Sequence, residues 1–332
     1  VKPTCDQQTF GTLWFDQNSA QGLLEFCKRV SGNDTITIKG AYLPRPNYYS
    51  SCAENSETHK IYCFSGYGAS TDIVEYDPNS DRVSVKNAIM PSERYQHACA
   101  EDSSTHKIYC FGGYDTGILR QIVEYDPNQD VLTVKSATLP SAREYLSCAE
   151  NSATHKIYCF CGFGGGNSNE IIEYNPATDT ISTMRAVLPT SRKGLSCAED
   201  STTNKIYCFG GESDIDEILE YDSSTDSMSI MNSVLPTGRD SLSCEENSET
   251  HTIFCFGGYD SQLLDQITEF IPTADTLQIR NGKIPSPRRG ISCVENSETF
   301  SIYCFGGYDG AGITEIVEYY PYGPSFAWVN VA

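Results

Sequence analysis

The sequence predicts an all-β fold, a β-propeller whose blades are small sheets of four antiparallel strands. Six copies of one pattern follow one another along the chain, and each copy holds two cysteines that are 11 residues apart. The first cysteines of successive copies are separated by 47 or 49 residues. A repeat of this length is typical of propellers and other arrays, in which each unit packs mainly against its neighbours.

One repeat contains four short strands separated by turn signals. In the copy that begins near Glu93, residues 95–102 predict strand A and residues 103–106 predict a hairpin turn. Residues 107–113 predict strand B, whose final glycines permit an abrupt change of direction. Residues 121–126 and 131–137 predict strands C and D on either side of a Pro-Asn-Gln-Asp turn. Four such strands form one propeller blade.

The two ends of the chain determine the number of blades, for which the sequence predicts seven. Residues 35–41 fit strand D of a first blade, and three short segments before them fit its strands C, B and A, at 23–26, 13–15 and 3–6. The tail, residues 325–331, fits strand D of the last copy. We therefore expect a single domain over residues 1–332, with blades at approximately 1–44, 45–91, 92–140, 141–189, 190–236, 237–285 and 286–332. The alternative is six blades preceded by an N-terminal extension.

The paired cysteines predict one disulfide within most blades. The two cysteines of a copy flank the A–B turn, so they fall opposite each other on neighbouring strands, at a spacing that suits a disulfide. The expected pairs are Cys52 with Cys63, Cys99 with Cys110, Cys148 with Cys159, Cys197 with Cys208, Cys244 with Cys255 and Cys293 with Cys304. Cys5 and Cys27 are expected to pair within the first blade. Cys161 is left over, either as a buried free thiol or as a link to another chain.

Three recurring features of the copies resemble the kelch repeat of the galactose-oxidase/kelch-like superfamily. A glycine pair closes strand B, a tyrosine lies in strand C, and P-x-x-R precedes the next strand A; examples are Gly112-Gly113, Tyr125 and Arg143. The resemblance covers nearly the whole chain and implies a kelch-type propeller. The usual strand D tryptophan is missing except at Trp328, and the cysteine pairs are an addition, which indicates a cysteine-rich, secreted variant.

The amino-acid composition indicates the compartment of the protein and excludes some classes of partner. Fifteen regularly spaced cysteines indicate an oxidising environment, so we expect a secreted, extracellular protein. The sequon at Asn33 is compatible with glycosylation there. A net charge of −21 argues against nucleic acid and against anionic membrane surfaces as partners.

No constellation of residues predicts catalysis or a resident cofactor. Four of the five histidines recur at one turn position in different copies, so they cannot converge on one metal. A glutamate two residues after the first cysteine recurs near one mouth of the expected tunnel. This ring could hold Ca²⁺; its members are Glu54, Glu101, Glu150, Glu199, Glu246 and Glu295.

The D–A and B–C loops share one rim in a propeller, and there the sequence places a candidate binding surface. Aromatic and arginine side chains on loops are typical of recognition surfaces. The rim residues are Arg94, Tyr114, Asp115, Arg143, Phe163, Arg192, Glu212, Arg239, Tyr259, Asp260, Arg288, Arg289, Tyr308 and Asp309. We expect a non-enzymatic structural or protein-interaction propeller that binds other proteins or itself, self-assembling into a matrix or fibre. A glycan-binding, lectin-like propeller is the alternative, and a secreted enzyme is third.

Overall fold

The computed structural model describes residues 34–68, 71–212 and 214–321 in full, together with the backbone of three short strands near the chain ends. These strands are β1 (Leu13–Phe15), β2 (Leu24–Arg29) and β27 (Phe326–Asn330). No helix among the described residues is long and apolar enough to cross a bilayer.

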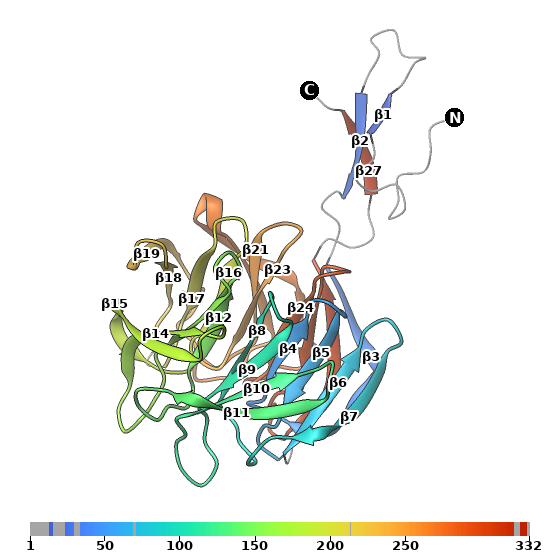
Figure 1. Ribbon diagram of the computed structural model, residues 1–332. Coiled ribbons are helices and arrows are strands. Elements are labelled where there is room, and N and C mark those ends of the chain that lie inside the picture. Colours follow the sequence, from blue (N-terminus) through green and yellow to red (C-terminus); the bar gives the residue numbers. More distant parts are fainter. Residues whose placement is uncertain are drawn as a thin grey trace.

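The described residues form a β-propeller with six four-stranded blades arranged around a common axis (Figure 1). Each blade runs A to D from the axis outwards, in antiparallel order. Blade 1 holds β4 (Ser51–Asn55), β5 (Lys60–Phe64), β6 (Asp72–Asp77) and β7 (Arg82–Ile89). Blade 2 holds β8 (Ala98–Asp102), β9 (Lys107–Phe111), β10 (Gln121–Asp126) and β11 (Val131–Thr138). Blade 3 holds β12 (Ser147–Asn151), β13 (Lys156–Phe160), β14 (Ser168–Asn175) and β15 (Thr180–Arg192).

The other three blades repeat this order. Blade 4 holds β16 (Ser196–Asp200), β17 (Lys205–Phe209), β18 (Glu217–Asp222) and β19 (Ser227–Val234). Blade 5 holds β20 (Ser243–Asn247), β21 (Thr252–Phe256), β22 (Gln266–Ile271) and β23 (Thr276–Lys283), with a short 3₁₀ turn, η1 (Pro272–Ala274), before its last strand. Blade 6 holds β24 (Ser292–Asn296), β25 (Ser301–Phe305), β26 (Ile313–Tyr320) and, from the other end of the chain, β3 (Thr35–Asn47).

Blade 6 corrects the predicted blade number from seven to six. Residues 35–41 do form a strand D, but β3 pairs antiparallel with β26, with Thr37 opposite Glu318 and Ile38 opposite Val317. The N-terminal strand thus completes the last blade and joins the two ends of the propeller. The expectation that the tail supplies strand D of the last blade is wrong.

Of the segments assigned to a first blade, β1 and β2 instead form a separate three-stranded sheet with the tail strand, in the order β1-β2-β27, and residues 3–6 lie outside the described residues. β27 pairs with β2, Phe326 lying opposite Arg29 in register. Cys5 and Asn33 lie outside the described residues, and Cys27 is described only by its backbone. The Cys5–Cys27 disulfide and glycosylation at Asn33 therefore stay predictions.

The six disulfides predicted between strands A and B are present, one in each blade. The two strands pair so that the bonded cysteines lie directly opposite each other, with Cα atoms 4.0–4.1 Å apart. The bridges join Cys52 to Cys63, Cys99 to Cys110, Cys148 to Cys159, Cys197 to Cys208, Cys244 to Cys255 and Cys293 to Cys304.

The strand B cysteine of every bridge is buried in a seam between blades. Cys159, Cys255 and Cys304, for example, are at most 4% exposed and belong to hydrophobic clusters that span two blades. These cysteines therefore contribute to the hydrophobic core as well as to the disulfide, and they are not exposed to a partner. Each bridge fixes the innermost hairpin of its blade.

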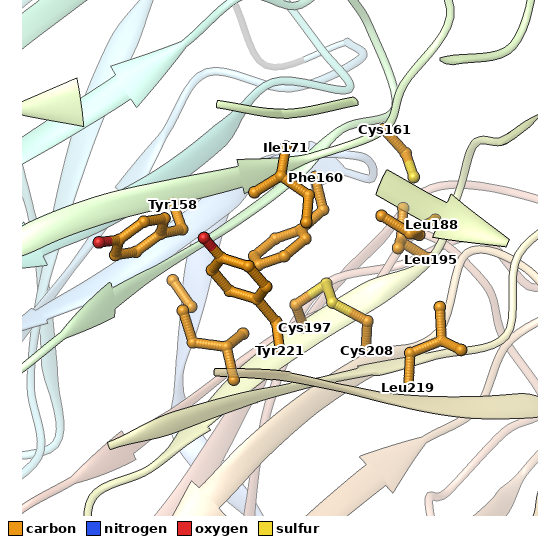
Figure 2. Close-up of a cluster of buried hydrophobic side chains, with 12 residues drawn as sticks. Tyr158, Phe160, Cys161, Ile171, Leu188, Leu195, Cys197, Cys208, Leu219 and Tyr221 are labelled. Atoms are coloured by element: carbon orange, nitrogen blue, oxygen red, sulfur yellow. A yellow bond between two sulfur atoms is a disulfide. The ribbon is translucent and has the colours of Figure 1, made fainter. Parts of the chain in front are cut away.

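The hydrophobic core lies in the seams between adjacent blades. Figure 2 shows the seam of blades 3 and 4, where Tyr221 from β18 packs on Tyr158 and Phe160 from β13. The ring centroids are 5.5 and 5.6 Å apart, in tilted and edge-to-face arrangements. Equivalent aromatic groups fill the other seams, so each blade is stabilised mainly by its two neighbours.

An outer ring of aspartates links the same neighbours by hydrogen bonds. Directly before strand D of each blade, one aspartate accepts a backbone N–H from strand D of the preceding blade at 2.8–3.0 Å; in blades 1–5 it lies in the C–D turn, and in blade 6 it precedes β3. These residues are Asp81, Asp130, Asp179, Asp226, Asp275 and Asp34. The turn aspartates therefore join the blades as well as shaping the turns.

Candidate binding face and axial tunnel

The propeller has two faces with different chemistry. The D–A and B–C loops, called here the loop face, lie at one end of the axis, and the A–B hairpin turns, called the hairpin face, lie at the other. On the loop face each D–A loop pairs with the B–C loop of the next blade, as in the bridges of Tyr48 with Tyr67 and Tyr95 with Tyr114. The two loop types therefore share one rim, as the sequence predicts.

Each blade contributes one such pair of residues to the rim, and the pairs are not all alike. Blades 1 and 2 contribute tyrosine pairs, whereas the others combine a charged residue with an aromatic residue or with an opposite charge. In order from blade 1 the pairs are Tyr48/Tyr67, Tyr95/Tyr114, Glu144/Phe163, Lys193/Glu212, Asp240/Tyr259 and Arg289/Tyr308. The rim is thus chemically asymmetric although its backbone repeats.

Five tyrosines form a continuous aromatic arc on the loop face. At one end of the arc, the Tyr48 ring centroid lies 4.8 Å from that of Tyr67 and 5.2 Å from that of Tyr308. Tyr67 continues to Tyr95 at 5.3 Å, and Tyr95 to Tyr114 at 5.5 Å. Tyr67 is 49% exposed. These five residues are called the tyrosine arc below; it presents aromatic surface to solvent across blades 6, 1 and 2.

Two cations of the rim lie over aromatic rings, and one of them, Arg289, extends the arc beyond Tyr308. The Arg289 guanidinium lies 4.9 Å from the Tyr259 ring centroid and 5.6 Å from that of Tyr308. The Lys193 ammonium lies 4.7 Å from the Phe163 ring centroid. Cation–π contacts of this kind hold the charged groups over the rings and keep both on the surface.

Five of the six arginines predicted for the binding rim are buried. Arg94, Arg143, Arg192, Arg239 and Arg288 are at most 3% exposed. Arg192 and Arg288 donate to carboxylates at the start of strand C, on Glu217 at 2.6 Å and Glu315 at 2.9 Å, and Arg143 pairs with Glu170 in the same way. These arginines fix the B–C loop to the sheet and are not exposed to a partner. The exposed rim therefore holds fewer residues than the sequence predicts. Its other members are half-buried, except Asp309, which is exposed.

Two of the buried arginines have no carboxylate at this position. Arg94 donates to Gln121 and Arg239 to Gln266, the residues that replace glutamate in blades 2 and 5. Burial, only partly offset by Asp115, lowers the pKa of Arg94 to about 10. Blades 2 and 5 therefore hold a less well-compensated charge than blades 3, 4 and 6.

The axial tunnel narrows at the loop face to a ring of backbone hydrogen bonds. One residue per blade donates its N–H to the carbonyl oxygen of its neighbour in the preceding blade, at 2.8–3.0 Å. The residues are Tyr49, Gln96, Tyr145, Gly194, Ser241 and Gly290, all with positive φ. A cavity of about 100 Å³ lies at this ring.

The predicted glutamate ring lines the tunnel at the hairpin face. Its six carboxylates border a cavity of about 220 Å³, together with Glu245. Each accepts the backbone N–H of a serine in the preceding blade at 2.7–3.0 Å, for example Ser56 to Glu101. The ring therefore joins the blades to one another.

Burial of these carboxylates changes their acidity. Desolvation, and to a smaller extent neighbouring carboxylates, raise the pKa of Glu199 and of Glu245 to about 8 against hydrogen bonds that lower it. The pKa of Glu295 is also raised well above its usual value by burial. Glu199 and Glu245 therefore retain their protons at neutral pH, and Ca²⁺ at the ring stays a prediction.

Serine, histidine and glutamate meet at four seams of the hairpin face, but their geometry differs from that of a catalytic triad. At the seam of blades 1 and 2, His106 Nδ1 lies 3.2 Å from Glu101 Oε1 and 3.0 Å from Ser56 Oγ. The same nitrogen thus faces both partners, whereas a triad histidine contacts acid and nucleophile through opposite nitrogens. Ser56 Oγ also donates to Glu101, which leaves it unactivated.

Cys161 is unpaired and fully buried. Burial raises the pKa of its thiol to about 12, and its carbonyl oxygen accepts a hydrogen bond from Arg143. It replaces the first glycine of the pair that closes strand B and adopts the same positive φ. In the folded chain this thiol is inaccessible to a second chain.

Taken together, a ring of four-stranded blades with loop-borne recognition groups defines a propeller that scaffolds interactions. The family description KLHDC2/KLHL20/DRC7 Kelch-repeats domain matches residues 52–232, more than half of the 332 residues. The chain belongs to this kelch-repeat family, which confirms the resemblance in its strand B glycines and strand C tyrosines. Kelch propellers generally mediate protein–protein interactions. No curated protein matches the chain.

Proposed function

We propose that this chain is a secreted, non-enzymatic kelch propeller that binds a protein partner through its loop face. The observation that carries the proposal is the tyrosine arc. Tyrosines supply large, rigid contact areas at low entropic cost and are enriched where binding energy concentrates. The arc occupies only part of the rim, so it favours one partner in one orientation over a symmetric assembly around the axis.

Secretion is supported by the disulfides. Six bridges, one in every blade, require an oxidising compartment during folding. Each closes a loop of about 12 residues, worth about 3 kcal/mol in the chain-entropy treatment. A fold whose blades all rely on such bridges suits an extracellular setting.

Self-association is the narrower part of the proposal. The outermost strand of each blade has a free edge at the circumference, and five blades place an exposed valine or isoleucine at its fourth position: Ile38, Val85, Val134, Ile230 and Ile279, 46–56% exposed. Repeated apolar edge positions favour lateral contacts between copies. Sedimentation velocity should show concentration-dependent oligomers that Val85→Lys with Val134→Lys removes; a monomer at every concentration contradicts this part.

A glycan ligand is the second candidate, favoured by one observation. The half-buried ring of Tyr114 directly precedes Asp115 in a polar loop, and Tyr95 joins it to the exposed ring of Tyr67, so aromatic surface and a carboxylate for a sugar lie on one stretch of the rim. Binding on a glycan array that Tyr67→Ala abolishes supports this candidate. An array without hits removes it.

Two exposed tyrosines allow a matched test of the loop face. Tyr67 lies in the arc, whereas Tyr42 lies on the outer strand of blade 6, and they are 49% and 53% exposed. In cross-linking of tagged chain with the extracellular fluid of its source, Tyr67→Ala should lose the partners that wild type and Tyr42→Ala retain. Equal recovery by both variants, or loss only in Tyr42→Ala, contradicts the proposed face.

A further inference from the structure

Two seams of the hairpin face combine a histidine with two carboxylates. Each group takes an aspartate from one blade and a glutamate and a histidine from the next. The groups are Asp102, Glu150 and His155 at the seam of blades 2 and 3, and Asp200, Glu246 and His251 at the seam of blades 4 and 5. Within each group the two carboxylate oxygens and the ring nitrogen lie within 4.8 Å of one another. The same set of metal-ligand atoms is therefore built twice.

The aspartate sets these two seams apart from the other four. The other blades have asparagine at its position, and the asparagine amide donates across the seam to a backbone carbonyl oxygen of the next blade at 2.7–2.8 Å. These bonds join Asn55 to His106, Asn151 to Asn204, Asn247 to Phe300 and Asn296 to His59.

An aspartate has no N–H with which to make this bond. Among the described residues, no hydrogen bond reaches the carbonyl oxygen of His155 or of His251. Each of the two seams thus lacks a link between blades worth about 1 kcal/mol and carries an additional negative charge instead. A cation held between the blades would compensate for both changes.

The ligand atoms are ordered, and the histidine gives access from solvent. The rings of His155 and His251 are 44% and 43% exposed on the hairpin face. Asp102 is 2% exposed and is fixed by a hydrogen bond of 2.7 Å from Thr105 Oγ1 to its Oδ2. A carboxylate has about four lone-pair sites, so this one keeps capacity for a cation.

The spacing of the ligand atoms is close to that of a zinc site. His155 Nδ1 lies 3.2 Å from Glu150 Oε1 and 3.1 Å from Ser103 Oγ. Neighbouring ligand atoms are about 3.4 Å apart in a tetrahedral site with bonds of about 2.1 Å. The serine hydroxyl or a water completes four positions.

We propose that each of these two seams binds one divalent transition-metal ion of the zinc type through an aspartate, a glutamate and a histidine of adjacent blades. The ion links the two blades where the asparagine amide links them elsewhere. This site lies on the hairpin face and is independent of the function proposed for the loop face.

The ligand set favours zinc over calcium. A neutral imidazole nitrogen is a ligand for zinc and related transition metals, and two carboxylates match the charge of a divalent ion. Calcium requires about six to eight oxygen ligands, more than the two acids and one hydroxyl of a seam supply. The ring of glutamates on the axis is a different arrangement, because it has no histidine nitrogen directed into it.

Calorimetric titration of the full, disulfide-intact chain with Zn²⁺ tests the proposal by its stoichiometry. Wild type should bind two ions, and an excess of Ca²⁺ should not displace them. Asp102→Asn and Asp200→Asn restore the residue of the other four blades, so each should fold with an unchanged or higher Tm and bind one ion fewer. The double variant should bind none. A wild type that binds no zinc, or a double variant that binds as much as wild type, overturns the proposal.

Nitrogen-15 NMR of the histidine rings locates the ions within the folded chain. Zinc should shift His155 and His251 and leave His59 and His106, which face asparagine, unchanged. An equal response of all four rings overturns the role assigned to the aspartates. Because the ligands bind metal in their deprotonated forms, the affinity should fall between pH 7.5 and pH 5.5.

A gain of binding provides the converse test. Asn55→Asp gives the seam of blades 1 and 2 the same ligand set, with Glu101 and His106, and should raise the stoichiometry to three. A folded Asn55→Asp chain that still binds two ions contradicts the proposal. Tyr67→Ala should bind zinc as wild type does, so failure of the loop face leaves this result unaffected.

Discussion

The amide of Tyr49 donates a hydrogen bond of 2.8 Å to the carbonyl oxygen of Gly290, although 241 positions separate them in the sequence. This bond closes the axial backbone ring between blade 1 and blade 6. Each of the six blades contributes one residue to this ring, so the bond between Tyr49 and Gly290 completes it. It rests on the same closure that β3 makes at the circumference by joining β26.

The contact between these two residues predicts the effect of filling the glycine. A Cβ on Gly290 would lie 2.8 Å from the ring of Tyr49, whereas one on Gly194, also at positive φ, would lie 3.2 Å from Asp240 Cβ. Gly290→Ala should therefore lower the free energy of unfolding by about 1–3 kcal/mol, and Gly194→Ala by less. Urea denaturation measures both. An equal loss in the two variants would show that backbone strain, and not the Tyr49 contact, decides.

The glutamate ring predicts a stability that decreases as pH rises. Because the pKa values of Glu199 and Glu245 are raised to about 8, the folded chain binds protons that the unfolded chain releases above its ordinary pKa of about 4.3. Stability from these groups is fully present below that value and is lost up to about pH 8, by about 1.4 kcal/mol per pH unit for each extra proton. Thermal unfolding should show a higher Tm at pH 5 than at pH 8.5.

Glu245 provides the control for this pH dependence. Four other blades have alanine at its position: Ala53, Ala100, Ala149 and Ala198. Glu245→Ala should raise the Tm at pH 8.5 and flatten its dependence on pH. An unchanged pH profile would mean that the buried carboxylates do not retain their protons.

The buried arginines predict a stabilising substitution. Gln121→Glu places opposite Arg94 the carboxylate that Glu217 and Glu315 supply to Arg192 and Arg288. We expect a gain of about 1 kcal/mol, because a charged acceptor replaces a neutral one on a buried guanidinium. Glu217→Gln is the reciprocal variant and should lose a similar amount in guanidinium chloride denaturation. A loss of stability in Gln121→Glu would contradict this account of the arginines.

The disulfides predict a uniform cost of removal. Replacing Cys52 and Cys63 together by alanine should lower the free energy of unfolding by about 3 kcal/mol, since the bridge closes a loop of about 12 residues in the unfolded chain. The equivalent double variant at Cys197 and Cys208 should lose the same amount. Cys161→Ala is the control without a bridge. A cost near zero in both double variants, by calorimetry, would contradict a stabilising role.

Strand positions and cysteine pairing could be predicted because they are local. A two-residue alternation and a turn of fixed length determine which cysteines face each other, and each repeat carries these signals. The blade number could not be obtained this way. Residues 35–41 read as a strand D in either arrangement, and the tail reads as a strand that could pair with either edge. The available signal was the absence of a cysteine pair 11 residues apart and of a glycine pair in residues 1–34.

The sequence predicted where the candidate site lies but not which of its residues are exposed. The order of the loops correctly placed the rim on one face. Because the arginines lie on loops, the sequence predicted that they are exposed. Five of them are instead buried against strand C. A glutamate or glutamine recurs 25–27 residues after each of these five arginines and was the signal for their pairing. The tyrosine arc depends on contacts between different blades, which no single repeat encodes.

The pairing of β3 with β26 closes the six-bladed ring, and disulfide trapping tests this pairing directly. Thr35 lies opposite Tyr320 in this pair of strands. Thr35→Cys with Tyr320→Cys should form a bridge on oxidation, seen as a joined peptide in non-reducing mass mapping of the folded chain. If a cysteine introduced in strand 326–330 is trapped against β26 instead, and the thiol introduced at position 35 stays free, the six-bladed closure is contradicted.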